Sequence, residues 1–181
     1  MDEFEFDTLA IRAGHQRSNF QENSEAIFPT SSFVFKNAEE AAARFAGDDD
    51  GFFYSRISNP TRKCFQDRLA ALERGETCVA TSSGMSAILA VMLGVLKAGD
   101  HVVSSRSIFG TSTVLFSNYL EKFGIGFDFV ELSDIDAWQQ AIQPNTCILF
   151  AETPSNPITE LVDISELAGI AHSNNCLLVI D

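Results

Sequence analysis

Short apolar runs alternate with amphipathic segments from residue 52 to the end of the sequence. The runs predict strands at 77–84, 101–105, 127–132, 146–152 and 176–181. The segments between them predict helices at 59–75, 85–100, 111–124, 134–142 and 163–175. Strands that are apolar on both faces are typical of parallel sheets covered by helices on both sides. We therefore expect an α/β fold with a mostly parallel, doubly wound sheet.

The first part of the chain is less regular. Residues 27–37 predict an extended segment, and residues 37–47 predict an Ala-rich helix with Asn37 as its N-cap. The aspartates of the sequence GDDDG at 47–51 point in different directions when adjacent, which favours a solvated turn over a metal site. We expect an N-terminal arm with a short helix at 1–50 and a separate sheet domain at 51–181.

Composition and charge narrow the possible partners. Hydrophobic residues make up 45% of the chain and include 16 Phe, which is ample for a core. The formal net charge of −13 argues against nucleic acid and anionic membrane surfaces as partners. The 4 cysteines form no CxxC pair, the N-terminus lacks a signal pattern, and no apolar run has the length of a membrane helix. These features predict a cytoplasmic protein with reduced thiols.

The turn after the first predicted strand is a candidate anion site. Ser83 and Gly84 lie where that strand gives way to a helix, and a helix start exposes main-chain N–H groups that suit a phosphate. Gly84 could supply a backbone conformation that other residues avoid. The motif alone leaves open a turn of small residues that serves packing only.

Three further stretches carry candidate chemistry. Tyr54 and Arg56 lie two apart in a segment read as extended, so both side chains can point the same way toward a phosphate. A core tyrosine beside a surface ion pair is the alternative. Asn156 follows a strand between two prolines, where it can contact a ligand oxygen or only cap a turn. Asp181 ends the last strand.

Together these groups could surround one flat phosphorylated ring. Pyridoxal 5′-phosphate requires anion donors for its phosphate and a carboxylate that keeps its ring nitrogen protonated. The 3 histidines, His15, His101 and His172, have no cysteine or carboxylate at metal-ligand spacing, so we predict no metal.

The stretches YSRISNPT, SSGMSAI, SRSIFG, ETPSNP and VID, in this order, resemble the Cys/Met-metabolism family of pyridoxal-phosphate enzymes. This is the cystathionine γ-synthase-like group, with a fold of the aspartate-aminotransferase type. The resemblance implies that Gly84 and Met85 donate main-chain N–H groups to the phosphate. It also implies that Tyr54 and Arg56 reach the phosphate of a neighbouring subunit's cofactor, and hence a homo-oligomer, either a dimer or a homotetramer.

The same resemblance assigns roles around the ring. It implies that Asn156 faces the phenolic oxygen and that Asp181 pairs with the pyridine nitrogen. Phe109 occupies the position where many relatives carry a tyrosine stacked on the ring. The stacking would remain there, whereas an acid–base hydroxyl would be lost.

Within the family, residues 6–35 and 105–112 are most similar to members that exchange the succinyl group of O-succinylhomoserine for sulfide, giving homocysteine for methionine biosynthesis. Sister activities remain the alternative: cystathionine γ-synthase, O-acetylhomoserine sulfhydrylase, or methionine or cystathionine γ-lyase. A non-catalytic binding or interaction module is the third reading. The family's Schiff-base lysine follows the strand aspartate, and none of the lysines here lies in such a turn: Lys36, Lys63, Lys97 and Lys122. We therefore expect the N-terminal part of a larger domain, inactive by itself.

Overall fold

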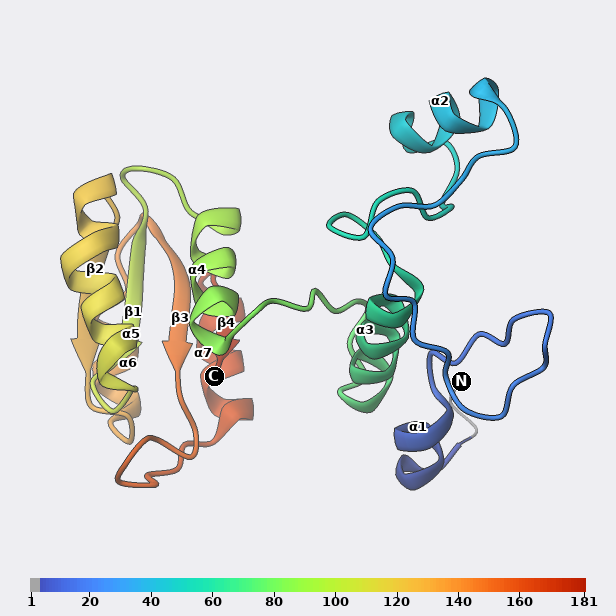
Figure 1. Ribbon diagram of the computed structural model, residues 1–181. Coiled ribbons are helices and arrows are strands. Elements are labelled where there is room, and N and C mark those ends of the chain that lie inside the picture. Colours follow the sequence, from blue (N-terminus) through green and yellow to red (C-terminus); the bar gives the residue numbers. More distant parts are fainter. Residues whose placement is uncertain (1–3) are drawn as a thin grey trace. The chain divides into compact units, whose positions relative to one another are not determined.

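The computed structural model describes residues 4–181 and divides into two compact units. One unit extends to Ala80, and the other comprises Thr81–Asp181 (Figure 1). Each is described by itself.

The first unit contains three helices joined by long irregular segments. These are α1 (Phe6–Arg12), α2 (Ala38–Ala46) and α3 (Pro60–Leu72). The Oδ1 of Asn37 accepts a hydrogen bond from the main-chain N of Glu40 at 2.7 Å, and Asn59 caps α3 in the same manner. Such caps satisfy N–H groups that a helix start leaves unpaired, so the predicted starts of α2 and α3 are confirmed.

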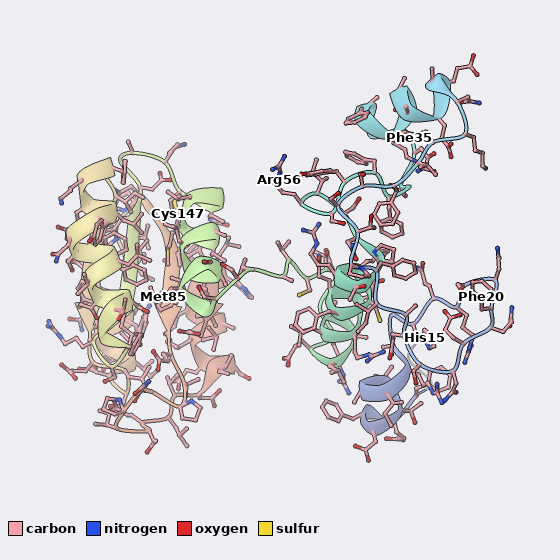
Figure 2. All side chains as sticks on the ribbon, in the orientation of Figure 1. His15, Phe20, Phe35, Arg56, Met85 and Cys147 are labelled. Carbon is pink, nitrogen blue, oxygen red and sulfur yellow. The ribbon has the colours of Figure 1, made fainter. Side chains whose placement is uncertain are left out.

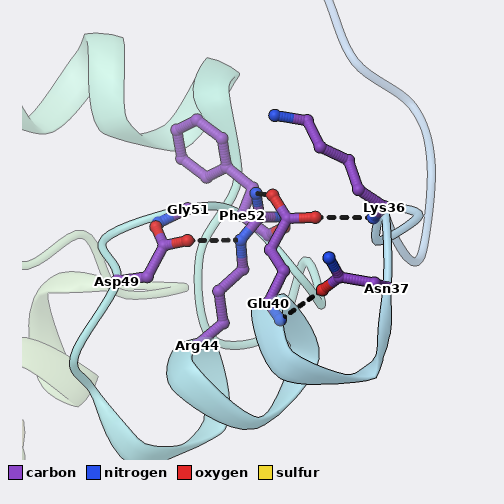
Figure 3. A network of polar contacts seen from close by, with 7 residues as sticks. All are labelled: Lys36, Asn37, Glu40, Arg44, Asp49, Gly51 and Phe52. Atoms are coloured by element: carbon purple, nitrogen blue, oxygen red, sulfur yellow. Dashed lines mark hydrogen bonds and ion pairs between the residues drawn. The ribbon is translucent and has the colours of Figure 1, made fainter.

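Arg44 organises the segment around α2 (Figure 3). Its guanidinium donates to Glu40 at 2.6 Å, to Asp49 at 3.3 Å and to the carbonyl of Phe52 at 2.8 Å. The second oxygen of Glu40 accepts from the main-chain N of Lys36 at 2.5 Å. The hydrogen bond from Gly51 N, together with Arg44, lowers the pKa of the Asp49 carboxyl. The loop at 47–51 thus holds the Arg44 side chain in place through Asp49.

The second unit is a four-stranded parallel sheet with the order β2-β1-β3-β4. Its strands are β1 (His101–Ser105), β2 (Gly126–Val130), β3 (Thr146–Ala151) and β4 (Leu177–Ile180). The helices between and before them are α4 (Gly84–Val95), α5 (Gly110–Val114), α6 (Ile135–Gln140) and α7 (Ile164–Ser173). The fold-class prediction is confirmed.

Alternation along the strands divides the core into two layers. Val102 of β1 packs with residues of α4 and of the α5 region, whereas the next residue, Val103, packs with α6 and α7. On β3, Phe150 faces the first layer and Leu149 the second. Successive side chains of a strand point to opposite faces, so helices on both sides bury the apolar residues of the strands.

Among the predicted helices and strands, three features differ in the structure. Residues 77–81 form no strand, because they pair with no other strand among residues 4–181, and Val79 is exposed. The helix expected at 111–124 consists of α5, a π-helical turn (Leu115–Tyr119) and a 3₁₀ turn (Leu120–Phe123). The helix predicted to reach residue 75 ends at Leu72, and Arg74 takes the left-handed conformation (φ 54°).

The order of the strands creates a switch point between β1 and β3. The chain leaves β1 into α5 on one face of the sheet, and it leaves β3 toward α7 on the other face. Ligands of open α/β sheets bind beyond the carboxyl ends of strands at such a point. Among residues 4–181, no helix is both long and apolar enough to cross a membrane.

Candidate active site

A hollow of about 540 Å³ opens at the carboxyl end of the sheet. It lies within the second unit and draws residues from the start of α4 and from the segments that follow β1, β3 and β4. The lining residues are Gly84, Met85, Ile88, Phe109, Glu152, Thr153, Pro154, Asn156 and Asp181. Five of the predicted site residues, Gly84, Met85, Phe109, Asn156 and Asp181, therefore line one cavity.

The start of α4 presents free main-chain donors to this hollow. The hydroxyl of Ser83 caps the helix by accepting from the main-chain N of Ser86 at 3.2 Å. Within the described residues, the main-chain N–H groups of Gly84 and Met85 have no hydrogen-bond partner, as is usual for the first turn of a helix. Ser83 thus orients the helix start whose free N–H groups can hold an anion.

Gly84 does not have the unusual backbone conformation that the sequence suggested. Its φ lies outside the positive region, and a Cβ added there would meet no protein atom within 4 Å. The fold itself therefore does not require glycine at this position. The open space beside Gly84 belongs to the hollow, where a ligand can approach the main chain closely.

Phe109 and Met85 form the apolar part of the lining. Phe109 lies at the N-cap position of α5 and is 43% exposed, so its ring is available to a ligand. The buried hydroxyl of Ser112 contacts the Met85 sulfur at 3.7 Å. Met85 is labelled in Figure 2, on the unit that carries the sheet.

Asp181 and Asn156 contribute polar side chains from neighbouring segments. The main-chain N of Asp181 donates to the carbonyl of Ala151 at 2.9 Å, and its carbonyl accepts from Thr153 N at 3.3 Å. These bonds continue the β3–β4 pairing and fix the Asp181 backbone. Within the described residues, neither the Asp181 carboxylate nor the Asn156 amide group has a hydrogen-bond partner. Both side chains are exposed and can bind a ligand.

Glu152 is the site residue that sequence reasoning missed. Its side chain is buried, and its two oxygens accept from the main-chain N of Phe109 at 2.6 Å and of Asn156 at 2.8 Å. A carboxylate directly after an apolar strand was the available signal. The sequence gives no indication that this carboxylate joins two segments far apart in the chain.

Tyr54 and Arg56 belong to the first unit, where Figure 2 labels Arg56. The extended part ends at Tyr54, which forms an isolated antiparallel bridge with Ser32. Arg56 lies in the turn that follows, where the carbonyl of Tyr54 accepts from the main-chain N of Ile57 and Ser58 at 2.8 and 2.9 Å, so the predicted extended segment does not reach Arg56. The Arg56 guanidinium lies 4.8 Å from the centre of the Tyr54 ring. The turn, together with this cation–π contact, keeps the two side chains together.

None of the lysines lines the hollow in the described part of the chain. Lys63 pairs with Asp67 at 2.7 Å, and Lys122 lies 5.5 Å from the Tyr119 ring centre. Residues 4–181 likewise contain no cluster of three or more His, Cys, Asp or Glu side chains that could hold a metal ion.

The donor set fits a flat, phosphorylated, nitrogen-containing ring. Free N–H groups at the start of α4 match a phosphate, the exposed face of Phe109 matches an aromatic plane, and the free carboxylate of Asp181 matches a protonated ring nitrogen. The chain's acidic net charge of −13 makes such local donors necessary for any anion.

Comparison with known proteins supports the same interpretation of the site. The chain is 54% identical to O-succinylhomoserine sulfhydrylase of Pseudomonas aeruginosa over 176 residues, which covers 97% of this chain and 44% of the relative. It is 41% identical to L-methionine gamma-lyase of Fusobacterium nucleatum subsp. polymorphum, covering 96% of this chain and 44% of that one. The chain thus spans less than half the length of these relatives.

A solved structure shares the fold. The structure of a putative O-acetylhomoserine (thiol)-lyase from Campylobacter jejuni, which contains N′-pyridoxyl-lysine-5′-monophosphate, superposes with a TM-score of 0.94 at 32% identity and covers 99% of this chain and 44% of its own. The family model for Cys/Met metabolism PLP-dependent enzymes matches residues 7–181. The chain belongs to the Cys/Met metabolism family of pyridoxal-phosphate-dependent enzymes.

Proposed function

We propose that the complete protein replaces the succinyl group of O-succinylhomoserine with sulfide. The C–O bond at the γ carbon breaks and a C–S bond forms there, so that homocysteine and succinate are the products of a step in methionine biosynthesis. The observation that carries this proposal is the 54% identity to O-succinylhomoserine sulfhydrylase over 97% of the chain. This identity exceeds the 41% to L-methionine gamma-lyase over a matching segment.

In this proposal the start of α4 holds the cofactor phosphate. The main-chain N–H groups of Gly84 and Met85 donate to its oxygens, and Ser83 keeps the helix start in place through its bond to Ser86. The positive end of the helix dipole adds to this attraction. Because water is displaced from these donors on binding, the contacts gain strength in the sheltered part of the hollow.

The remaining lining residues hold the ring. When bound, pyridoxal phosphate withdraws electrons from the substrate carbon attached to it. We assign to Asp181 the task of keeping a proton on the ring nitrogen, to Asn156 a hydrogen bond to the phenolic oxygen, and to Phe109 stacking on the ring face. Phe109 lacks a hydroxyl, so it has no acid–base role.

Tyr54 and Arg56 are proposed to complete the phosphate site of a neighbouring subunit. The contact between the guanidinium and the Tyr54 ring supports this, since it pre-orients a forked donor beside a hydroxyl. The complete protein would then be a homo-oligomer, a dimer or homotetramer, whose site is incomplete in one chain.

The proposed location is the cytoplasm. The support comes from the cysteines: Cys64, Cys78, Cys147 and Cys176 are all free thiols. Burial raises the pKa of Cys64, Cys147 and Cys176, which favours the unreactive protonated form.

Substrate assays of the complete protein test the activity. Loaded with pyridoxal phosphate, it should form homocysteine fastest from O-succinylhomoserine and sulfide. O-Acetylhomoserine with sulfide, O-succinylhomoserine with cysteine, and methionine alone are the competing reactions. Faster release of methanethiol and 2-oxobutyrate from methionine would identify a γ-lyase, and no turnover with bound cofactor would identify a binding module.

A further inference from the structure

We propose that Glu152 is a positioning residue that sets the width of the cofactor hollow between Phe109 and Asn156. This inference rests on the proposed function, since it assigns to Glu152 a task toward the ring that these two residues are proposed to contact. Glu152 would act on the ring indirectly, by fixing the backbone positions of Phe109 and Asn156.

The geometry supports this role because each oxygen of the carboxylate has its own partner. One oxygen accepts from Phe109 N at 2.6 Å, and the other accepts from Asn156 N at 2.8 Å. Phe109 follows β1, and Asn156 follows β3, so one side chain ties together the two segments that flank the switch point. Within the described residues, neither main-chain N–H has another acceptor.

Because the Glu152 carboxylate is buried, losing either of its hydrogen bonds would be costly. Glu152 is 7% exposed, and a buried carboxylate requires compensating donors. Bonds to an ionised acceptor are stronger than neutral ones and hold their partners in a narrower geometry. The separation of the Phe109 and Asn156 backbones is therefore held before any ligand binds, which is part of the preorganisation that a flat ring requires.

The isosteric variant Glu152→Gln isolates this role. A glutamine has one acceptor oxygen and one amide that cannot accept, so it can hold Phe109 N or Asn156 N but not both. The overall volume of the side chain is kept. We expect one of the two segments to be released while the core around it remains packed.

Glu160 provides a matched control on the same segment. Its carboxylate accepts from the hydroxyls of Ser107 at 2.8 Å and Ser133 at 3.4 Å, and Glu160 does not line the hollow. Glu160→Gln therefore makes the same chemical change to a carboxylate that links two loops, without altering a residue that lines the hollow. The two variants separate loss of positioning from loss of loop stability.

The experiment compares both variants with the unsubstituted complete protein. The measurements are pyridoxal-phosphate affinity, the absorption maximum of the bound cofactor, and urea unfolding of the cofactor-free protein. Glu152→Gln should weaken cofactor binding about tenfold or more and shift the absorption maximum, since one charge-assisted bond is lost. Glu160→Gln should retain both cofactor properties, even where the two variants lose similar stability.

Equal cofactor affinity and equal spectra in the two variants would overturn the positioning role. If the unsubstituted protein bound no pyridoxal phosphate, the proposed function itself would fail. The two failures are distinguishable, because the first requires a normal unsubstituted protein.

Discussion

The free space at Gly84 permits a test in which the same substitution is made twice on one helix. Gly84 and Gly94 both lie in α4, are exposed, and have no protein atom within 4 Å of an added Cβ. Neither has a positive φ. Only Gly84 lines the hollow. Gly84→Ala and Gly94→Ala therefore differ in their relation to the proposed phosphate and hardly at all in their effect on the fold.

The magnitudes follow from this geometry. Alanine in place of glycine within a helix stabilises it by about 0.5–1 kcal/mol, because the unfolded chain loses conformational freedom. We expect that gain for Gly94→Ala and no loss for Gly84→Ala in the absence of cofactor. A methyl group at position 84 should keep a phosphate away from the main chain. Losing one charge-assisted contact costs about 1.5–3 kcal/mol, or roughly a 10- to 100-fold weaker affinity.

The assay is equilibrium binding of pyridoxal phosphate to the cofactor-free complete protein, beside urea unfolding of each variant. The expected result is weakened binding in Gly84→Ala alone, with stability at or above that of the unsubstituted protein. Equal affinities in the two variants would contradict the phosphate assignment. A clear loss of stability in cofactor-free Gly84→Ala would instead contradict the geometric reasoning, since the fold would then require glycine.

Three other predictions address Arg56, Asp181 and His101. Arg56→Ala should weaken cofactor retention by about 1.5–3 kcal/mol in a dialysis titration, whereas Arg106→Ala, which removes an exposed ion pair with Glu131, should not. Asp181→Asn should reduce turnover far more than cofactor affinity, and near-normal turnover would exclude the ring-nitrogen role. Burial lowers the pKa of His101 from its ordinary value of 6.5. The unfolded chain therefore binds this proton more readily than the folded chain, and the free energy of unfolding should fall as the pH drops below about 6.5. A His101→Asn variant should show a shallower fall.

Much of the fold was predictable because its signals are local. Asn37, Asn59 and Ser83 each precede a helix and cap it within three residues, so the chain positions of these starts depend on neighbouring atoms alone. The strands β1 and β3 carry apolar residues on both faces, which indicates burial between helices without any knowledge of their partners.

The errors arose where structure depends on distant residues. Residues 77–84 have the composition of a strand, yet a strand exists only when another pairs with it, and none does so here among residues 4–181. The segment of Tyr54 and Arg56 was predicted as extended throughout, whereas its extended part ends at Tyr54, whose bridge partner Ser32 lies far earlier in the chain. Glu152 escaped notice because its partners lie 43 and 4 residues away.

The two ends of the sheet explain why residue types alone could not identify the site. At the amino end of the strands, His101 is buried and bonds to Thr146 at 2.8 Å, while its other ring nitrogen faces Gln143 and Asp128 at 3.3 and 3.5 Å. At the carboxyl end, the Asp181 carboxylate and the Asn156 amide have no such partners within the described residues. Both ends carry polar and titratable groups, and in the sequence they look alike. The difference is that the first set is buried and satisfies itself, whereas the side chains of the second set are exposed and remain free to bind a ligand. Polar groups left unpaired around a hollow therefore support the carboxyl end as the proposed cofactor site.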